Sequence, residues 1–150
     1  MKNLDLGITD GRIKIYINKE VYGDDRVIYV NPSDTNIFTR TQKAIEKIKA
    51  MQIDLDNTIK ALAESDKENP DIMCTLIEKT DKDIKKAVND IFNYDVSTAV
   101  FGETSAMANI NGVPFIEVFL NAMIPVIQNS IEEQSSTVKK RNSNIKKYVK

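Results

Sequence analysis

The positions of glycine constrain the fold of this 150-residue chain more than any other feature of its sequence. The five glycines lie near the two ends: Gly7, Gly11, Gly23, Gly102 and Gly112. None falls between residues 24 and 101. Because glycine inside a helix costs about 1 kcal/mol relative to alanine, long helices avoid it. The middle of the chain is therefore predicted to be helical.

Two long helices are predicted in this glycine-free segment, over about residues 35–64 and 70–92. The first would start after the capping residues Ser33 and Asp34, and the second at Pro70. Their mostly apolar positions recur with heptad spacing in four series: 38, 45, 52 and 59; 41, 48, 55 and 62; 73, 80 and 87; 77, 84 and 91. Two striped helices joined by a short polar loop predict an antiparallel αα-hairpin.

The N-terminal segment has the period-two alternation of a β-strand. Ile13, Ile15 and Ile17 alternate with polar or aromatic residues, and a second strand is predicted over Val27–Val30. We expect a β-hairpin, or a three-strand meander if residues 4–9 join it. Because two strands alone are only marginally stable in water, this sheet should pack against the helices.

A short helical turn, Val96–Phe101, is expected after the two long helices. Asp95 is predicted to cap this turn, and Gly102 to end it. Residues 103–112 are predicted to form a loop that leads into the last helix.

Asn111-Gly112 is predicted to open the last helix, with Pro114 at its start and Pro125 as a kink inside it. The fold class is therefore α+β, mostly α, with one domain over residues 1–135. Residues 136–150 are expected to form a basic, flexible tail, with a weak helix as the alternative.

This last helix is apolar around almost its whole circumference, so a core or a partner must bury it. Because the core of so short a chain would not cover it all, we expect the surplus surface to bind another protein. The candidate contact residues are large and apolar: Phe101, Ile110, Val113, Phe115, Ile116, Phe119, Leu120 and Met123. In the alternative interpretation, the helix is only the central core element of the fold.

The composition gives little support to catalytic or metal chemistry. The chain has no histidine and one cysteine, Cys74, so the commonest general base and zinc or iron–sulfur ligand sets are missing. No glycine-rich phosphate-binding loop is present. The acidic pairs Asp24–Asp25 and Asp54–Asp56 are interpreted as a turn and a solvated helix face. We expect a non-enzymatic protein without a cofactor or a bound metal.

The N-terminus lacks the basic and apolar blocks of a signal peptide, and no apolar run approaches the roughly 20 residues of a membrane span. A single cysteine suits a reducing cytosol. We therefore expect neither export nor membrane insertion.

The net charge of −1 is unevenly distributed along the chain. Residues 139–150 carry six basic side chains and no acid, which leaves −7 for the first 138 residues. The candidate nucleic-acid contacts in this segment are Lys139, Lys140, Arg141, Lys146 and Lys147. Such a segment would bind phosphates without sequence preference, but it would equally pair with the acidic body or aid solubility.

The order of these features resembles one protein family. The sequence VNPSDTN at residues 30–36 follows the short β element and precedes the two helices. The turn at Val100-Phe101-Gly102, Asn111-Gly112 and the helix that begins Pro114-Phe115-Ile116 then follow in turn. This pattern, over about residues 11–131, is similar to the tail assembly chaperones of long-tailed, siphovirus-type phages that infect Gram-positive bacteria. The basic segment is not part of the resemblance.

The resemblance implies that the protein binds the long, helix-rich tape measure protein in the cytoplasm of the infected bacterial host. It would keep the apolar segments of that protein soluble, help recruit tail tube subunits and leave as the tube polymerises. Two other functions stay open: a virion structural protein, such as a connector or tube component, and a small nucleic-acid-binding regulator that uses the basic segment. Self-association also stays open, because helices with an apolar face can pack against each other between two chains as readily as within one hairpin.

Overall fold

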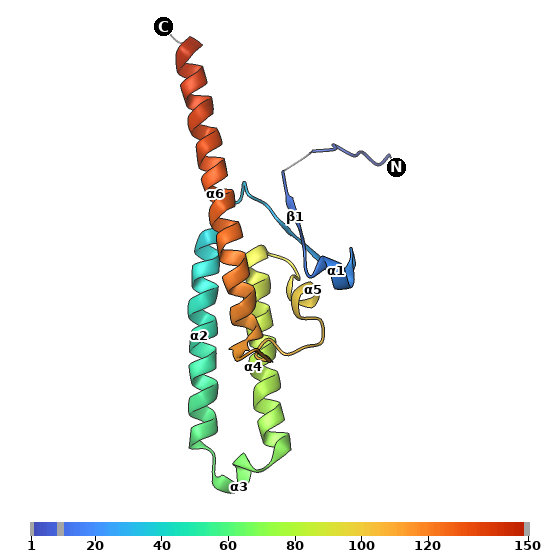
Figure 1. The fold of residues 1–150 in the computed structure, drawn as a ribbon, viewed down its shortest axis with the longest axis vertical. Helices are drawn as coiled ribbons and strands as arrows, with labels where there is room; N and C mark the ends of the chain where they lie inside the picture. The colour runs from blue at the N-terminus through green and yellow to red at the C-terminus, as the bar shows by residue number, and fades with distance from the viewer. Residues whose placement is uncertain (1, 9–10, 149–150) are drawn as a thin grey trace.

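The computed structural model describes the backbone of residues 2–8 and 11–148, and side chains up to residue 133 (Figure 1). The structure is 62% helical and contains a small antiparallel sheet near its N-terminus. This confirms the predicted α+β, mostly α class.

Two long helices, α2 (Ile37–Ala61) and α4 (Pro70–Phe92), form the antiparallel hairpin that the sequence predicts (Figure 1). α4 has the predicted bounds, and Asn69 caps it by accepting a hydrogen bond from the N–H of Asp71 at 3.0 Å. α2 ends earlier than predicted, because a short separate helix, α3 (Glu64–Lys67), occupies the connection.

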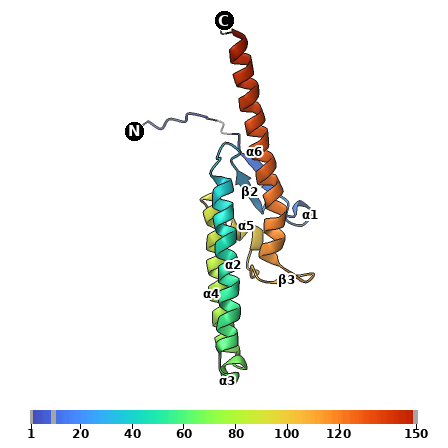
Figure 2. The ribbon, with the colours of Figure 1, turned by 90° about the vertical axis from the view of Figure 1, so that its left-hand side faces the viewer.

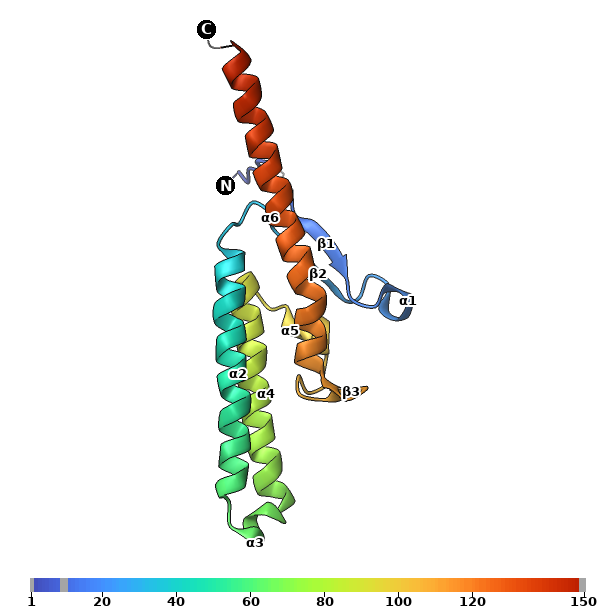
Figure 3. The ribbon, with the colours of Figure 1, turned by 60° about the vertical axis from the view of Figure 1, so that its left-hand side comes forward.

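The buried residues of the hairpin lie at one end of it. They are Ile37, Thr41, Ala44 and Ile48 in α2, and Ile84, Ala87, Val88 and Ile91 in α4. No residue between 49 and 83 is buried. The other end, which Figure 3 shows as a tip formed by α2, α3 and α4 alone, therefore lies outside the core.

The N-terminal sheet consists of two antiparallel strands, β1 (Ile13–Tyr16) and β2 (Val27–Val30). One helical turn, α1 (Lys19–Tyr22), lies in the connection between them. Ile28 and Val30 of β2 are buried in the core, so the sheet packs against the helices as predicted. Residues 2–8 form no strand in the structure, so the three-strand alternative is wrong for these residues, and residue 9 lies outside the described ones.

The short helix α5 (Ser97–Phe101) follows α4 through a turn that two side chains anchor. Asn89 Oδ1 accepts hydrogen bonds from two consecutive N–H groups at the start of α5, each at 2.8 Å. Asp95 accepts from the hydroxyl and the N–H of Thr98 at 2.7 and 3.2 Å, which is the predicted cap. These two bonds hold the pKa of Asp95 below its usual range. Gly102 ends the helix with a positive φ, also as predicted.

A second small hairpin lies where the sequence predicts a loop and a helix start. β3 (Asn109–Ile110) pairs antiparallel with β4 (Val113–Pro114). Asn111 and Gly112 form the two-residue turn, with φ angles of 52° and 89°. Positive φ at both positions is what a type I′ hairpin turn requires. The prediction that this dipeptide opens the last helix is therefore wrong, because its left-handed backbone reverses the chain instead.

The last helix, α6 (Phe115–Tyr148), is a single element of 34 residues that continues on both sides of Pro125. Figure 2 shows its first half beside the other elements and its second half extending past them. The backbone is helical as far as Tyr148, so the segment from residue 136 follows the weak-helix alternative. The basic side chains that we considered for nucleic-acid binding lie outside the described side chains: Lys139, Lys140, Arg141, Lys146 and Lys147.

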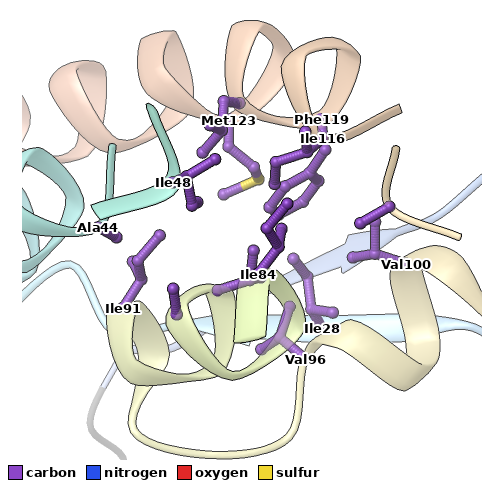
Figure 4. Packing of buried hydrophobic residues seen from close by; sticks show 14 of the residues in the cluster. Ile28, Ala44, Ile48, Ile84, Ile91, Val96, Val100, Ile116, Phe119 and Met123 are labelled. Atoms are coloured by element: carbon purple, nitrogen blue, oxygen red, sulfur yellow. The ribbon is translucent and has the colours of Figure 1, made fainter. Parts of the chain in front are cut away.

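One apolar core joins the sheet, α5 and the three long helices (Figure 4). Ile84 of α4 lies near its centre, with Ile28 of β2 on one side and Phe119 of α6 on the other. Ile48 of α2 and Met123 of α6 complete this layer. Each of these five side chains is buried, so the core is shared by segments far apart in the sequence.

An ion pair ties the segment after the sheet to both long helices of the hairpin. The guanidinium of Arg40 in α2 bonds the carboxylate of Asp34, and its Nε donates to the carbonyl of Ile91 in α4 at 2.8 Å. Both charged side chains are more than two-thirds buried. The hydrogen bond from Arg40 holds the pKa of Asp34 below its usual range.

We predict that Asp34→Asn lowers stability at pH 7 and flattens its dependence on acidic pH. Because the folded-state pKa of Asp34 is depressed, its carboxylate stabilises the fold above about pH 4, and this contribution is lost as the pH falls through the folded-state value. Urea unfolding from pH 7 to pH 2 measures the effect.

Asp24→Asn is the matched control, since that side chain is 77% exposed and pairs with Lys14 only at 3.7 Å. The Asp34 variant should lose about 1 kcal/mol or more at pH 7, and the control should stay within about 0.5 kcal/mol of the parent protein. The prediction would be contradicted if the free energy of unfolding of the Asp34 variant fell with acidic pH as steeply as that of the parent protein.

Candidate protein-interaction groove

Two adjoining hollows lie between α2 and α6, and together they form a groove. The lower hollow, of about 400 Å³, lies between residues 45–52 of α2 and 116–124 of α6. The upper one, of about 170 Å³, lies between residues 38–45 and 124–128. Ile45 and Ile124 line both hollows, which makes the groove continuous. At 1.5 Å per residue, the α2 wall is about 20 Å long, or four helical turns.

The groove exists because α2 packs mainly on α4, and makes only slight contact with α6. Its floor is formed by buried side chains: Thr41, Ile48, Ile116 and Ile127. Its apolar walls are Phe38 and Ile45 of α2 and Leu120 and Ile124 of α6. Except for Leu120, these wall residues are only half-buried, so apolar surface remains open between the two helices.

The rim of the groove is polar and mostly uncharged. It consists of Gln42, Lys49 and Gln52 on α2, and of Glu117, Asn121 and Gln128 on α6. The two charged residues, Lys49 and Glu117, have opposite signs and both line the lower hollow. An apolar strip with a polar rim is the arrangement typical of a protein-binding surface, and its helical walls match the shape of an amphipathic helix.

The side-chain spacing in both helices produces this surface. In α2, the series at 38, 45 and 52 faces the groove, whereas 41 and 48 of the second series form its floor. Of the two heptad series in α2, the second contributes the buried residues Thr41 and Ile48, whereas Phe38 and Ile45 of the first are only half-buried. Sequence reasoning therefore missed Phe38 and Ile45 as site residues, although the heptad series had already marked them as apolar.

Most of the eight predicted contact residues are buried within the chain itself. Phe101, Ile116, Phe119, Leu120 and Met123 are buried, and among them Ile116 and Leu120 also line the groove. The remaining three are less covered: Val113 and Phe115 are half-buried, and Ile110 is 38% exposed. Whether any of the eight contacts a partner stays a prediction.

α6 is positioned by contacts at its N-terminal end. The ring of Phe101 in α5 meets Phe115 and Phe119 edge to face, with centroids 4.9 and 6.0 Å apart. Asp81 of α4, which is also paired with Lys85, accepts a hydrogen bond at 2.7 Å from an N–H in the loop before β3. This loop in turn accepts hydrogen bonds from the first two N–H groups of α6, at 2.8 and 2.7 Å.

The described part of the chain contains no group of three or more histidine, cysteine or carboxylate residues that could hold a metal ion. Every buried side-chain nitrogen or oxygen among the described residues has a hydrogen-bond partner. Cys74 is exposed. Among the described residues, no helix has both the length and the hydropathy of a membrane-spanning segment.

Comparison of the chain with protein-family models, with curated proteins and with solved structures finds no match.

We predict that Phe119→Ala destabilises the fold by about 3–5 kcal/mol, because it empties a buried aromatic site against Phe101. Thermal unfolding followed by circular dichroism measures the loss. Val118→Ala is the control in the same helix, since Val118 is exposed and lines neither hollow. It should change stability by less than about 0.5 kcal/mol. Equal unfolding temperatures for the two variants would contradict this assignment of the core.

Proposed function

We propose that this protein is a non-catalytic tail assembly chaperone that binds a helix of a phage tape measure protein and helps recruit tail tube subunits in the cytoplasm of the infected host. The observation that carries the proposal is the groove between α2 and α6. It offers half-buried apolar walls to a partner while the core below it stays closed. The resemblance over residues 11–131 supplies the identity of the partner.

The dimensions and chemistry of the groove suit one amphipathic helix. A helix with apolar residues at i, i+3, i+4 and i+7, a pattern that covers about two turns, would place them on Ile45, Leu120 and Ile124. The groove has room for about two such repeats, because its α2 wall is about four turns long. A tape measure protein is long and rich in helices, so it would present many such segments in succession.

Temporary binding also agrees with the character of the rim. Four of its six residues are amides, which can donate or accept hydrogen bonds and so tolerate different polar partners: Gln42, Gln52, Asn121 and Gln128. With one cation and one anion on the rim, charge would add little selectivity. A surface of this kind favours moderate affinity for related segments over tight binding to one of them.

The proposal predicts that Ile45→Ser and Ile124→Ser each weaken binding to the tape measure protein of the same phage by about tenfold or more. Each change removes an apolar side chain from the centre of the interface. Co-purification and titration calorimetry with helical segments of that protein measure binding, and circular dichroism verifies the fold.

Val118→Ser is the matched control, because it removes an exposed apolar side chain of α6 that does not line the groove. It should bind like the parent protein. Unchanged binding by folded Ile45 and Ile124 variants would contradict the groove as the site. Stoichiometric retention of the protein in purified phage particles would contradict the chaperone role and favour a structural component.

A further inference from the structure

Residues 2–8 form an arm without helix or strand, and its apolar side chains are unusually exposed. Leu4, Leu6 and Ile8 are 90%, 80% and 79% exposed, more than any other large hydrophobic residue described. Figures 1 and 2 show this arm running away from the helices. Three neighbouring aliphatic side chains this exposed to water are typical of a surface that binds a partner.

The arm has the sequence pattern of a β-strand with one apolar face. Leu4, Leu6 and Ile8 alternate with Asp5 and Gly7, so successive side chains would point to opposite sides of a sheet. The same alternation predicts a third strand from the sequence, yet no strand forms in residues 2–8 of the single chain. The arm is therefore suited to pair with a strand that it does not contact here.

One edge of the N-terminal sheet is already occupied. The hydroxyl of Tyr94 accepts a hydrogen bond from the N–H of Tyr29 at 2.6 Å and donates to its carbonyl at 3.2 Å. Tyr29 lies in the middle of β2, and these two groups point away from β1. A third strand cannot pair there without displacing Tyr94.

The opposite edge, along β1, is open. Ile17 donates its N–H to Arg26, so odd-numbered residues of β1 make the bonds to β2. The N–H and carbonyl groups of Lys14 and Tyr16 therefore face outward, and the described residues supply no hydrogen-bond partner for them. An unpaired edge of this kind is a template for an added strand.

The faces of the arm and of β1 also match in polarity. The core side of β1 carries Ile13 and Ile15, and Ile17 follows on the same side. These three side chains are only half-buried, so apolar surface remains at this edge. A strand whose Leu and Ile side chains lie on that side would extend the apolar row. On the opposite face of the added strand, Asp5 would lie near Lys14, whose charge is opposite to its own.

We propose that residues 2–8 of one copy of this chain add as a third strand to the β1 edge of a second copy. Reciprocal exchange between two copies would pair both open edges and cover both arms in one closed dimer. This inference is independent of the helix-binding groove, because it uses neither α2 nor α6.

Self-association measured by sedimentation equilibrium tests the proposal. Leu4→Asn and Leu6→Asn should each raise the dissociation constant of the dimer by about tenfold or more, because each removes an aliphatic contact. Asn3→Ser, a change outside the apolar row of the arm, should have little effect. A parent protein that stays monomeric at high concentration, or Leu6→Asn without effect on association, would overturn the proposal.

The β1 edge is tested by two changes at one position. Lys14→Pro removes the outward N–H without breaking a bond to β2, whereas Lys14→Thr removes the side chain and keeps this N–H. The proline variant should associate about tenfold more weakly than the threonine variant, with equal circular dichroism spectra. Equal association of the two variants would show that the edge is not used.

A cross-link distinguishes exchange between chains from pairing within one. Asp5→Cys and Lys14→Cys are placed in separate chains that also carry Cys74→Ser, and the two are mixed with a short thiol-specific cross-linker. Cross-linked dimers that form only in the mixture support exchange. A third chain carries both cysteines and Cys74→Ser. A cross-link that forms only within this doubly substituted chain would overturn the proposal, and so would the absence of any cross-link.

Discussion

The contact of three aromatic rings, Phe101, Phe115 and Phe119, fixes where α6 lies, and the remaining architecture depends on it. Phe101 is almost completely buried and belongs to α5, which Asn89 and Asp95 anchor to the end of α4. The aromatic contact thus joins the first turns of α6 to α5, which is itself anchored to α4. On its other side, α6 makes only slight contact with α2, and the groove lies between these two helices.

The local elements could be predicted from the sequence because their signals act over short distances. Pro70 and its preceding cap set the start of α4, and the alternation of Ile13, Ile15 and Ile17 marks a strand. Asn111-Gly112 borders an apolar helix in the sequence, which favours a helix start, but in the structure it forms the turn of a hairpin. Its positive φ angles show that turn geometry, not helix capping, determined the local structure.

The site could be predicted only in part, because periodicity shows that a face is apolar but not which element covers it. Phe38 and Ile45 carry the same heptad signal as Ile48, yet the first two stay half-buried in the groove wall and the last is buried in its floor. The strongest apolar signal, around Phe119, belongs to the core. The apolar residues left open in the groove are ones of intermediate burial, which depends on packing and is not contained in one sequence.

The uneven burial along the hairpin has a consequence for its motions. Every buried residue of α2 and α4 lies in residues 37–48 or 84–91, so the intervening tip contributes little to the cooperative core. Opening the tip therefore needs less free energy than unfolding the whole domain, and its amide hydrogens should exchange with solvent through a separate, local pathway. Lys49 and Gln52, which line the lower hollow, lie at the boundary between the buried end of the hairpin and its tip. The lower hollow of the groove therefore borders the tip of the hairpin, which can open locally, whereas the upper hollow borders the buried residues of α2.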